Sequence, residues 1–85
     1  MIRINKLTDY GIVIAVRIAK EESERLHTAR EIAEDTHVPQ PTVTRLLKQL
    51  ARSGILTSTR GAAGGYSLAQ PAETISVARL VEALE

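Results

Sequence analysis

Residues 41–53 constrain the fold more than any other stretch of this chain. Arg45, Lys48 and Arg52 fall on one side of a helix drawn through the stretch, with Thr44 at the edge of that side. Four large apolar residues recur at the spacing i, i+3, i+4 and i+7, which places them on the opposite side: Val43, Leu46, Leu47 and Leu50. The stretch is therefore predicted to be a helix with one core face and one cationic, hydroxylated face.

Three further helices are predicted from apolar periodicity and from residues that favour helix ends. Asn5, Thr28 and Ser76 carry side chains that accept hydrogen bonds at helix N-termini. Glu31 follows Thr28 by three residues, the spacing of a capping box in which each side chain bonds the other residue's amide. Pro41 is tolerated in a first turn. The predicted helices span residues 5–20, 28–36, 41–53 and 76–84.

Residues 55–70, after a glycine that can stop the third helix, are predicted to form a β-hairpin. Residues that favour extended structure precede the glycine-rich reversal at 61–65, and Tyr66-Ser67-Leu68 alternates as a return strand. Eighty-five residues are enough for one domain with one core. The order of three helices, a hairpin and a last helix predicts a mostly α winged helix-turn-helix, with the hairpin as its wing.

The charges are distributed unevenly although the net charge is only +1. All ten acidic residues lie between Asp9 and Asp35 or between Glu73 and Glu85. Between these blocks the charged residues are all basic: Arg45, Lys48, Arg52 and Arg60. Such a segment is the electrostatic footprint of a nucleic-acid-binding protein, and a solvated surface with uneven charge is the alternative interpretation.

The third helix and the wing supply most of the predicted DNA contacts. The major groove admits one helix, so a reading helix must bury one side and present hydroxyls and cations on the other. Arg60 is placed to enter the minor groove or to hold a phosphate, and the glycines beside it let the backbone approach phosphate oxygens. A purely structural turn explains these glycines but not the arginine. The residues predicted to contact DNA are Arg3, Lys6, Thr28, Pro41, Thr42, Thr44, Arg45, Lys48, Arg52, Arg60, Gly61, Gly64, Gly65 and Tyr66.

Other classes of function lack their residues. The chain has no cysteine, which excludes disulfides and thiolate metal sites built from this chain alone. No apolar run reaches the ~20 residues of a membrane helix, and the N-terminus lacks a secretory leader, so a cytoplasmic location without a membrane partner is predicted. His27 and His37 are interpreted as solvated loop residues without the partners of a metal site, and a position near a phosphate is the alternative for His37. No nucleophile–base pair has a supporting motif, and the chain is predicted not to be an enzyme.

Three stretches resemble one family of bacterial regulators: residues 1–10, the predicted second helix, and above all residues 53–66 with the wing motif Arg-Gly-x-x-Gly-Gly-Tyr. Over essentially its whole length the chain is similar to the Rrf-type winged-helix repressors, which include IscR, NsrR and the regulators of the SUF iron–sulfur assembly operon, and most of all to the last group. The resemblance implies a homodimeric bacterial repressor of iron–sulfur assembly or of redox and nitrosative stress genes. It implies a pseudo-palindromic operator, with the third helix in the major groove and the wing in the minor groove.

The resemblance also implies an iron–sulfur sensor, held by three cysteines beyond the fourth helix, and a long dimerisation helix after it. Neither is present here, so we expect either a fragment of a longer protein or a naturally cysteine-free variant, with no cofactor bound to this chain itself. Alone, the chain is expected to bind DNA poorly and to be monomeric or weakly dimeric. In some cluster-binding relatives an acidic side chain of the first helix completes the coordination across the dimer, and Asp9 occupies the matching position. An exposed aspartate favoured by the helix dipole is the alternative.

Two interpretations of the whole chain remain at this point. The first is a sequence-specific DNA-binding transcription regulator. The second is a winged-helix module that binds protein and never DNA. The basic segment shared by the reading helix and the wing favours the first interpretation, because a protein-binding face does not need cations on both elements.

Overall fold

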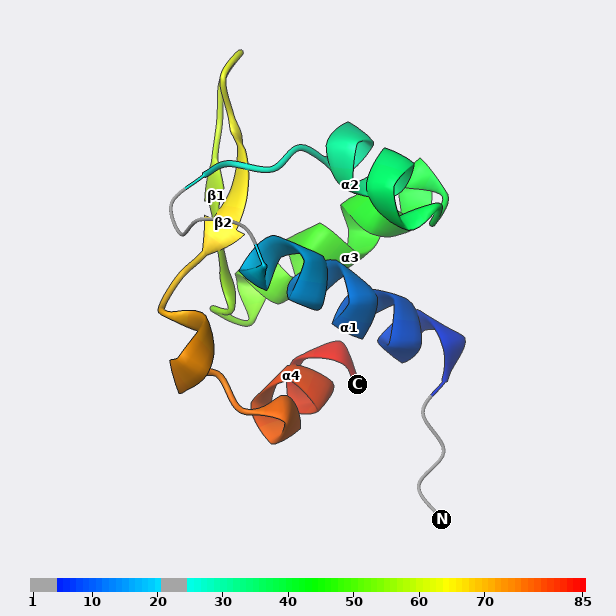
Figure 1. The fold of residues 1–85 in the computed structure, drawn as a ribbon, viewed down its shortest axis with the longest axis vertical. Coiled ribbons are helices and arrows are strands. Elements are labelled where there is room, and N and C mark those ends of the chain that lie inside the picture. The colour runs from blue at the N-terminus through cyan, green and yellow to red at the C-terminus, as the bar shows by residue number, and fades with distance from the viewer. Residues whose placement is uncertain (1–4, 21–24) are drawn as a thin grey trace.

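The computed structural model describes residues 5–20 and 25–85 and has the predicted order of elements (Figure 1). Arg3, one of the residues predicted to contact DNA, lies outside the described residues. The helices are α1 (Lys6–Ala19), α2 (Ala29–Thr36), α3 (Gln40–Arg52) and α4 (Val77–Leu84). The strands are β1 (Leu56–Thr59) and β2 (Gly65–Leu68), and a short 3-10 turn at Ala72–Thr74, which the sequence did not predict, precedes α4. The hairpin extends away from the four helices.

The three predicted N-caps are confirmed. The side chain of Asn5 accepts a hydrogen bond from the amide of Thr8, and that of Ser76 accepts one from the amide of Arg79. Thr28 accepts a bond of 3.1 Å from the amide of Glu31. Each cap satisfies one of the free N–H groups at a helix start, which is why the three helices begin where the sequence predicts.

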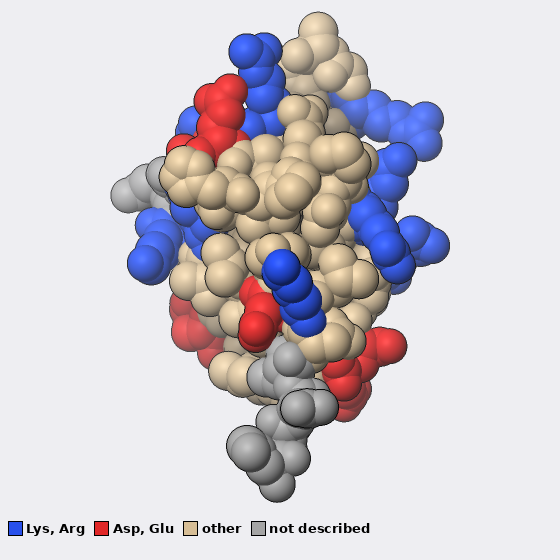
Figure 2. All heavy atoms as spheres, turned by 90° about the vertical axis from the view of Figure 1, so that its right-hand side faces the viewer, with Lys and Arg blue, Asp and Glu red and all other residues tan. Residues whose placement is uncertain are grey.

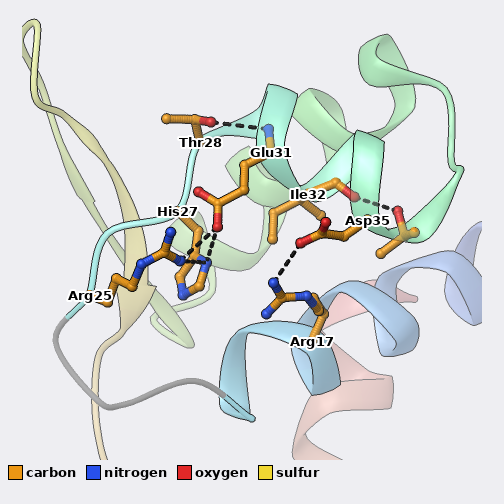
Figure 3. A network of polar contacts seen from close by, with 8 residues as sticks. Arg17, Arg25, His27, Thr28, Glu31, Ile32 and Asp35 are labelled. Atoms are coloured by element: carbon orange, nitrogen blue, oxygen red, sulfur yellow. Dashed lines mark hydrogen bonds and ion pairs between the residues drawn. The ribbon is translucent and has the colours of Figure 1, made fainter.

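The capping box at α2 is only half formed, and the predicted return contact of Glu31 is wrong. Its carboxylate instead accepts a hydrogen bond from Arg25 and lies beside the imidazole of His27 (Figure 3). A charged partner gives a stronger hydrogen bond than a backbone amide does.

The predicted core face of α3 is confirmed: its four apolar residues are at most 2% exposed. They pack against Ile14 and Ile18 of α1, Ile32 of α2 and Leu80 of α4 in a single core cluster. Two further bonds hold α4 to α3, because Gln49 donates to the carbonyl of Ala83 and Arg79 donates to the carbonyl of Ser53. The core therefore fixes which side of α3 faces outward.

The end of α3 leads directly into the hairpin. Gly54 has a φ of 83°, and the amide of Ile55 bonds to the carbonyl of Leu50 at 3.0 Å. This is the left-handed stop of a Schellman motif, which glycine adopts without steric cost. The predicted stop is confirmed, and α3 and β1 are joined by only three residues.

A residue from outside the hairpin pairs with its second strand, which the sequence did not predict. β1 and β2 are antiparallel, with Thr59 opposite Gly65 and Ser58 opposite Tyr66. On the other edge of β2, His27 forms an isolated antiparallel bridge with Tyr66. His27 is 1% exposed, so its interpretation as a solvated loop residue is wrong. His37 is exposed as expected and ends α2 in a left-handed conformation, with φ of 62°.

Candidate nucleic-acid interface

The outer face of α3 carries its basic side chains into solvent. Arg45, Lys48 and Arg52 are exposed, as is Pro41 in the first turn, while Thr42 and Thr44 are half-buried. These residues occupy the side opposite to the core because α3 buries the other side completely. The predicted division of α3 into a core face and a cationic face is confirmed.

The cations of this surface are not neutralised by neighbours. Among residues 5–20 and 25–85, the ion pairs join Arg17 to Asp35, Arg25 and His27 to Glu31, and Arg30 to Glu34. None of these pairs involves a cation of α3 or Arg60. Figure 2 shows basic side chains along the right-hand edge of the molecule with no acidic side chain between them. Positive charge left unpaired in this way attracts phosphate.

An open groove joins α3 to the wing. The groove has a volume of about 670 Å³, and none of its lining residues is acidic. It is lined by Lys48, Ala51, Arg52, Ser58, Arg60 and Tyr66. The structure therefore brings four of the predicted DNA-contacting residues together, although they lie as many as 18 positions apart in the sequence.

The groove offers the chemistry of a phosphate site. Three cations and two hydroxyl groups line it, and such groups make most protein contacts to a nucleic-acid backbone. Arg45 does not line the groove and lies nearer the start of α3. In a helix-turn-helix the N-terminal half of the reading helix faces base edges. The position of Arg45 is thus compatible with contacts to base edges, and the groove is compatible with binding phosphates.

Ser58 also lines the groove with a polar side chain, although the sequence did not predict a role for it. It lies on β1 opposite Tyr66, and strand alternation places it on the other face from Thr57 and Thr59. The alternation of side chains between the two faces of β1 is the sequence feature that could have identified Ser58. This alternation shows which face meets the groove only when Ser58 is known to lie opposite Tyr66.

The wing glycines have a structural task within the hairpin. A Cβ on Gly64 would lie 2.2 Å from the carbonyl oxygen of Thr59, and one on Gly65 would lie 2.8 Å from that of His27. A side chain at either position would therefore collide with backbone. Direct contacts of DNA with Gly61, Gly64 and Gly65 stay a prediction, since close packing by itself requires glycine at the last two positions.

Two predicted contact residues lie away from the groove. Thr28 caps α2, so its hydroxyl oxygen already accepts a hydrogen bond. Lys6 begins α1, with its ammonium nitrogen 5.7 Å from the centre of the Tyr10 ring. Neither residue lines the groove. Their contacts with DNA stay predictions.

The residues of this chain do not fit an iron–sulfur cluster. The sequence contains no cysteine, and in the described part of the chain no three His, Cys, Asp or Glu residues gather as metal ligands. Asp9 is exposed in the first turn of α1. The role of Asp9 as a cluster ligand stays a prediction. No helix within the described residues is both long and apolar enough to cross a membrane.

The fold and the basic groove define a winged helix-turn-helix protein. A family model for Rrf2, described as an iron-dependent transcriptional regulator, matches residues 4–85. The chain belongs to this family of transcriptional regulators, which confirms the resemblance seen in its sequence.

Individual relatives agree with this assignment. The chain is 32% identical over 73 residues to the HTH-type transcriptional regulator IscR of Cereibacter sphaeroides, covering 86% of this chain and 47% of that protein. CymR, the global cysteine regulator of B. subtilis, has a TM-score of 0.92 at 28% identity and is matched over 100% of this chain and 66% of its own. IscR of T. potens has a TM-score of 0.88 at 28% identity, with 99% and 61% covered.

The chain thus spans about half the length of IscR from Cereibacter sphaeroides and about two-thirds of the length of CymR from B. subtilis. The relatives are transcriptional regulators and not enzymes, as the sequence predicted for this chain. The winged-helix fold is confirmed as well.

Proposed function

We propose that this chain is the DNA-binding part of a transcription regulator and that it reads a duplex operator with α3 and the wing. The observation that carries the proposal is the groove in which Lys48 and Arg52 of α3 face Arg60 of the wing without an acidic neighbour. In the proposed complex the start of α3 lies in the major groove, with Arg45 near base edges. Lys48 and Arg52, on the α3 side of the groove, hold a phosphate backbone, and Arg60 reaches the minor groove.

The proposal extends to the assembly and the target. We place two copies on a pseudo-palindromic operator, because one reading helix covers one half-site and half-sites lie roughly one helical turn, ~34 Å, apart. From the resemblance to the Rrf-type repressors we propose repression of iron–sulfur assembly or of redox and nitrosative stress genes in a bacterial cytoplasm. Iron dependence in the family description supports this choice of target genes.

Fluorescence anisotropy with a labelled random-sequence duplex tests the DNA-binding proposal. The chain is expected to bind with an affinity that falls steeply between about 50 and about 200 mM salt. Replacing both Lys48 and Arg60 with alanine is expected to weaken binding, while Lys20→Ala, an exposed cation at the end of α1, is expected to leave binding nearly unchanged. A folded chain that binds no duplex at any salt concentration contradicts the proposal and favours a protein-binding winged-helix module.

A further inference from the structure

His27 occupies the junction between the wing and α2. Its amide donates to the carbonyl of Tyr66 and its carbonyl accepts from the amide of Tyr66, both at 2.8 Å. β2 therefore lies between β1 on one edge and His27 on the other. Thr28, the next residue, caps α2. One residue thus separates the backbone that pairs with the wing from the first residue of α2.

The contact between His27 and the wing is close. A Cβ on Gly65 would lie 2.8 Å from the carbonyl oxygen of His27 and 3.1 Å from its nitrogen. Gly65 precedes Tyr66, whose side chain lines the basic groove with Arg60. A displacement of His27 would therefore move the strand that holds one wall of the groove.

The imidazole of His27 is tied to α2. Nδ1 of His27 lies 3.3 Å from Oε2 of Glu31 and 3.2 Å from Nη1 of Arg25, and Nη1 of Arg25 lies 2.6 Å from the same carboxylate oxygen (Figure 3). The His27 side chain is 1% exposed, whereas that of Glu31 is 26% exposed. Burial alone raises the pKa of Glu31, but hydrogen bonds and charge from Arg25 and His27 bring that pKa below its usual value. The carboxylate is thus held in its charged form beside the imidazole.

The filling of apolar space explains why the side chain at position 27 is buried, but it does not explain the contacts of the imidazole with Glu31 and Arg25. A leucine would fill similar space and would leave the backbone bridge to Tyr66 in place. It would provide no polar atom for Glu31 or Arg25. The imidazole adds a directional link, because a hydrogen bond fixes orientation where apolar packing does not.

We propose that His27 is a positioning residue of the DNA-binding surface: its backbone holds β2, and its imidazole, through Glu31 and Arg25, holds that backbone against α2. The distance between Arg60 and the reading helix is then set by this junction. The proposal rests on the proposed DNA-binding function. It assigns to His27 no contact with DNA.

A double-mutant cycle in duplex binding tests the role of His27. Arg60→Ala removes one cation that displaces counterions from the duplex, which lowers the affinity about eightfold at about 0.1 M salt and reduces the slope of log affinity against log salt by about 0.9. His27→Leu is expected to lower the affinity for the duplex by as much as Arg60→Ala does, or by less, and to reduce the salt slope. In the Arg60→Ala background His27→Leu is expected to have a clearly smaller effect than in the unmodified chain. His27→Asn keeps a polar atom near the position of Nδ1 and is expected to restore part of the affinity.

Arg17→Gln provides a matched control. Arg17 pairs with Asp35, also on α2, at 2.5 Å, but this pair joins α1 to α2 and does not touch the wing. The control is expected to keep both the affinity and the salt slope. If His27→Leu does not fold by circular dichroism, Glu31→Ala removes the acceptor of the same link on the exposed side and carries the same expectation.

The outcomes separate the two proposals. Independent, multiplicative losses from His27→Leu and Arg60→Ala overturn the positioning role while leaving DNA binding intact. A folded His27→Leu variant with unchanged affinity and slope does so as well. Absence of duplex binding by the unmodified chain overturns both the proposed function and the role of His27.

Discussion

Lys48→Ala isolates the electrostatic part of the proposed interface. Lys48 is exposed on α3, lines the basic groove and forms none of the ion pairs found in the described part of the chain. Its removal is therefore expected to change the free energy of unfolding by no more than about 0.5 kcal/mol. It removes one phosphate contact, which corresponds to about 0.9 in the salt slope. At about 0.1 M salt the affinity then falls about eightfold, or about 1.2 kcal/mol, and the loss vanishes near 1 M.

Anisotropy titrations over a range of salt concentrations measure both the affinity and the slope. Because a phosphate contact carries no sequence information, the loss is expected to be equal on an operator duplex and on a random duplex. Lys20→Ala serves as the charge-matched control. A loss confined to one DNA sequence with an unchanged slope would mean that Lys48 reads a base. An unchanged affinity at low salt would refute the assignment of this face of α3 to DNA.

Three further predictions concern the wing, the core and the junction. Arg60→Ala is expected to cost about 1–3 kcal/mol of binding free energy, most on A·T-rich flanks, without unfolding the domain; footprinting that still shows flanking minor-groove protection would make the hairpin a structural brace. Leu47→Ala is expected to destabilise the fold by about 2–5 kcal/mol, because Leu47 is fully buried, and calorimetry should show a melting temperature lower by about 8 °C or more. The pKa of Glu31 lies below its usual value of 4.5, so its ionisation contributes stability that is complete above that pH and is lost as pH falls through the lowered pKa. Glu31→Gln is therefore expected to be less stable than the parent at neutral pH, and the difference in free energy of unfolding is expected to shrink as pH falls. Urea unfolding from about pH 7 to about pH 3 measures this difference, and a difference that stays constant would contradict the prediction.

Local rules account for what the sequence predicted well. The caps at Asn5, Thr28 and Ser76 depend on contacts within three residues, and the stop at Gly54 depends on a backbone conformation. The two faces of α3 follow from helical periodicity alone. These features need no knowledge of the tertiary structure, so they can be read directly from the chain.

Contacts that no local rule includes account for what was missed. His27 resembles a polar loop residue until Tyr66, 39 positions later, pairs with its backbone. Glu31 matches a capping box, but Arg25 and His27 lie close enough to attract its carboxylate. Ser58 enters the groove only through the register of the hairpin and the position of α3. The charge pattern grouped four cations, and packing decided that Lys48, Arg52 and Arg60 line one groove while Arg45 lies outside it.

Amide chemical-shift mapping during titration with a duplex shows which residues of the folded chain contact DNA. With ¹⁵N-labelled protein at low salt, we expect the perturbations to gather on the outward residues of α3, on Ser58 of β1 and on the wing around Arg60. The exposed apolar side of α1, at Val13 and Val16, should stay unperturbed. Perturbations concentrated on α1 or α4, or none at all while the chain is folded, would contradict the claim that the groove between α3 and the wing holds DNA.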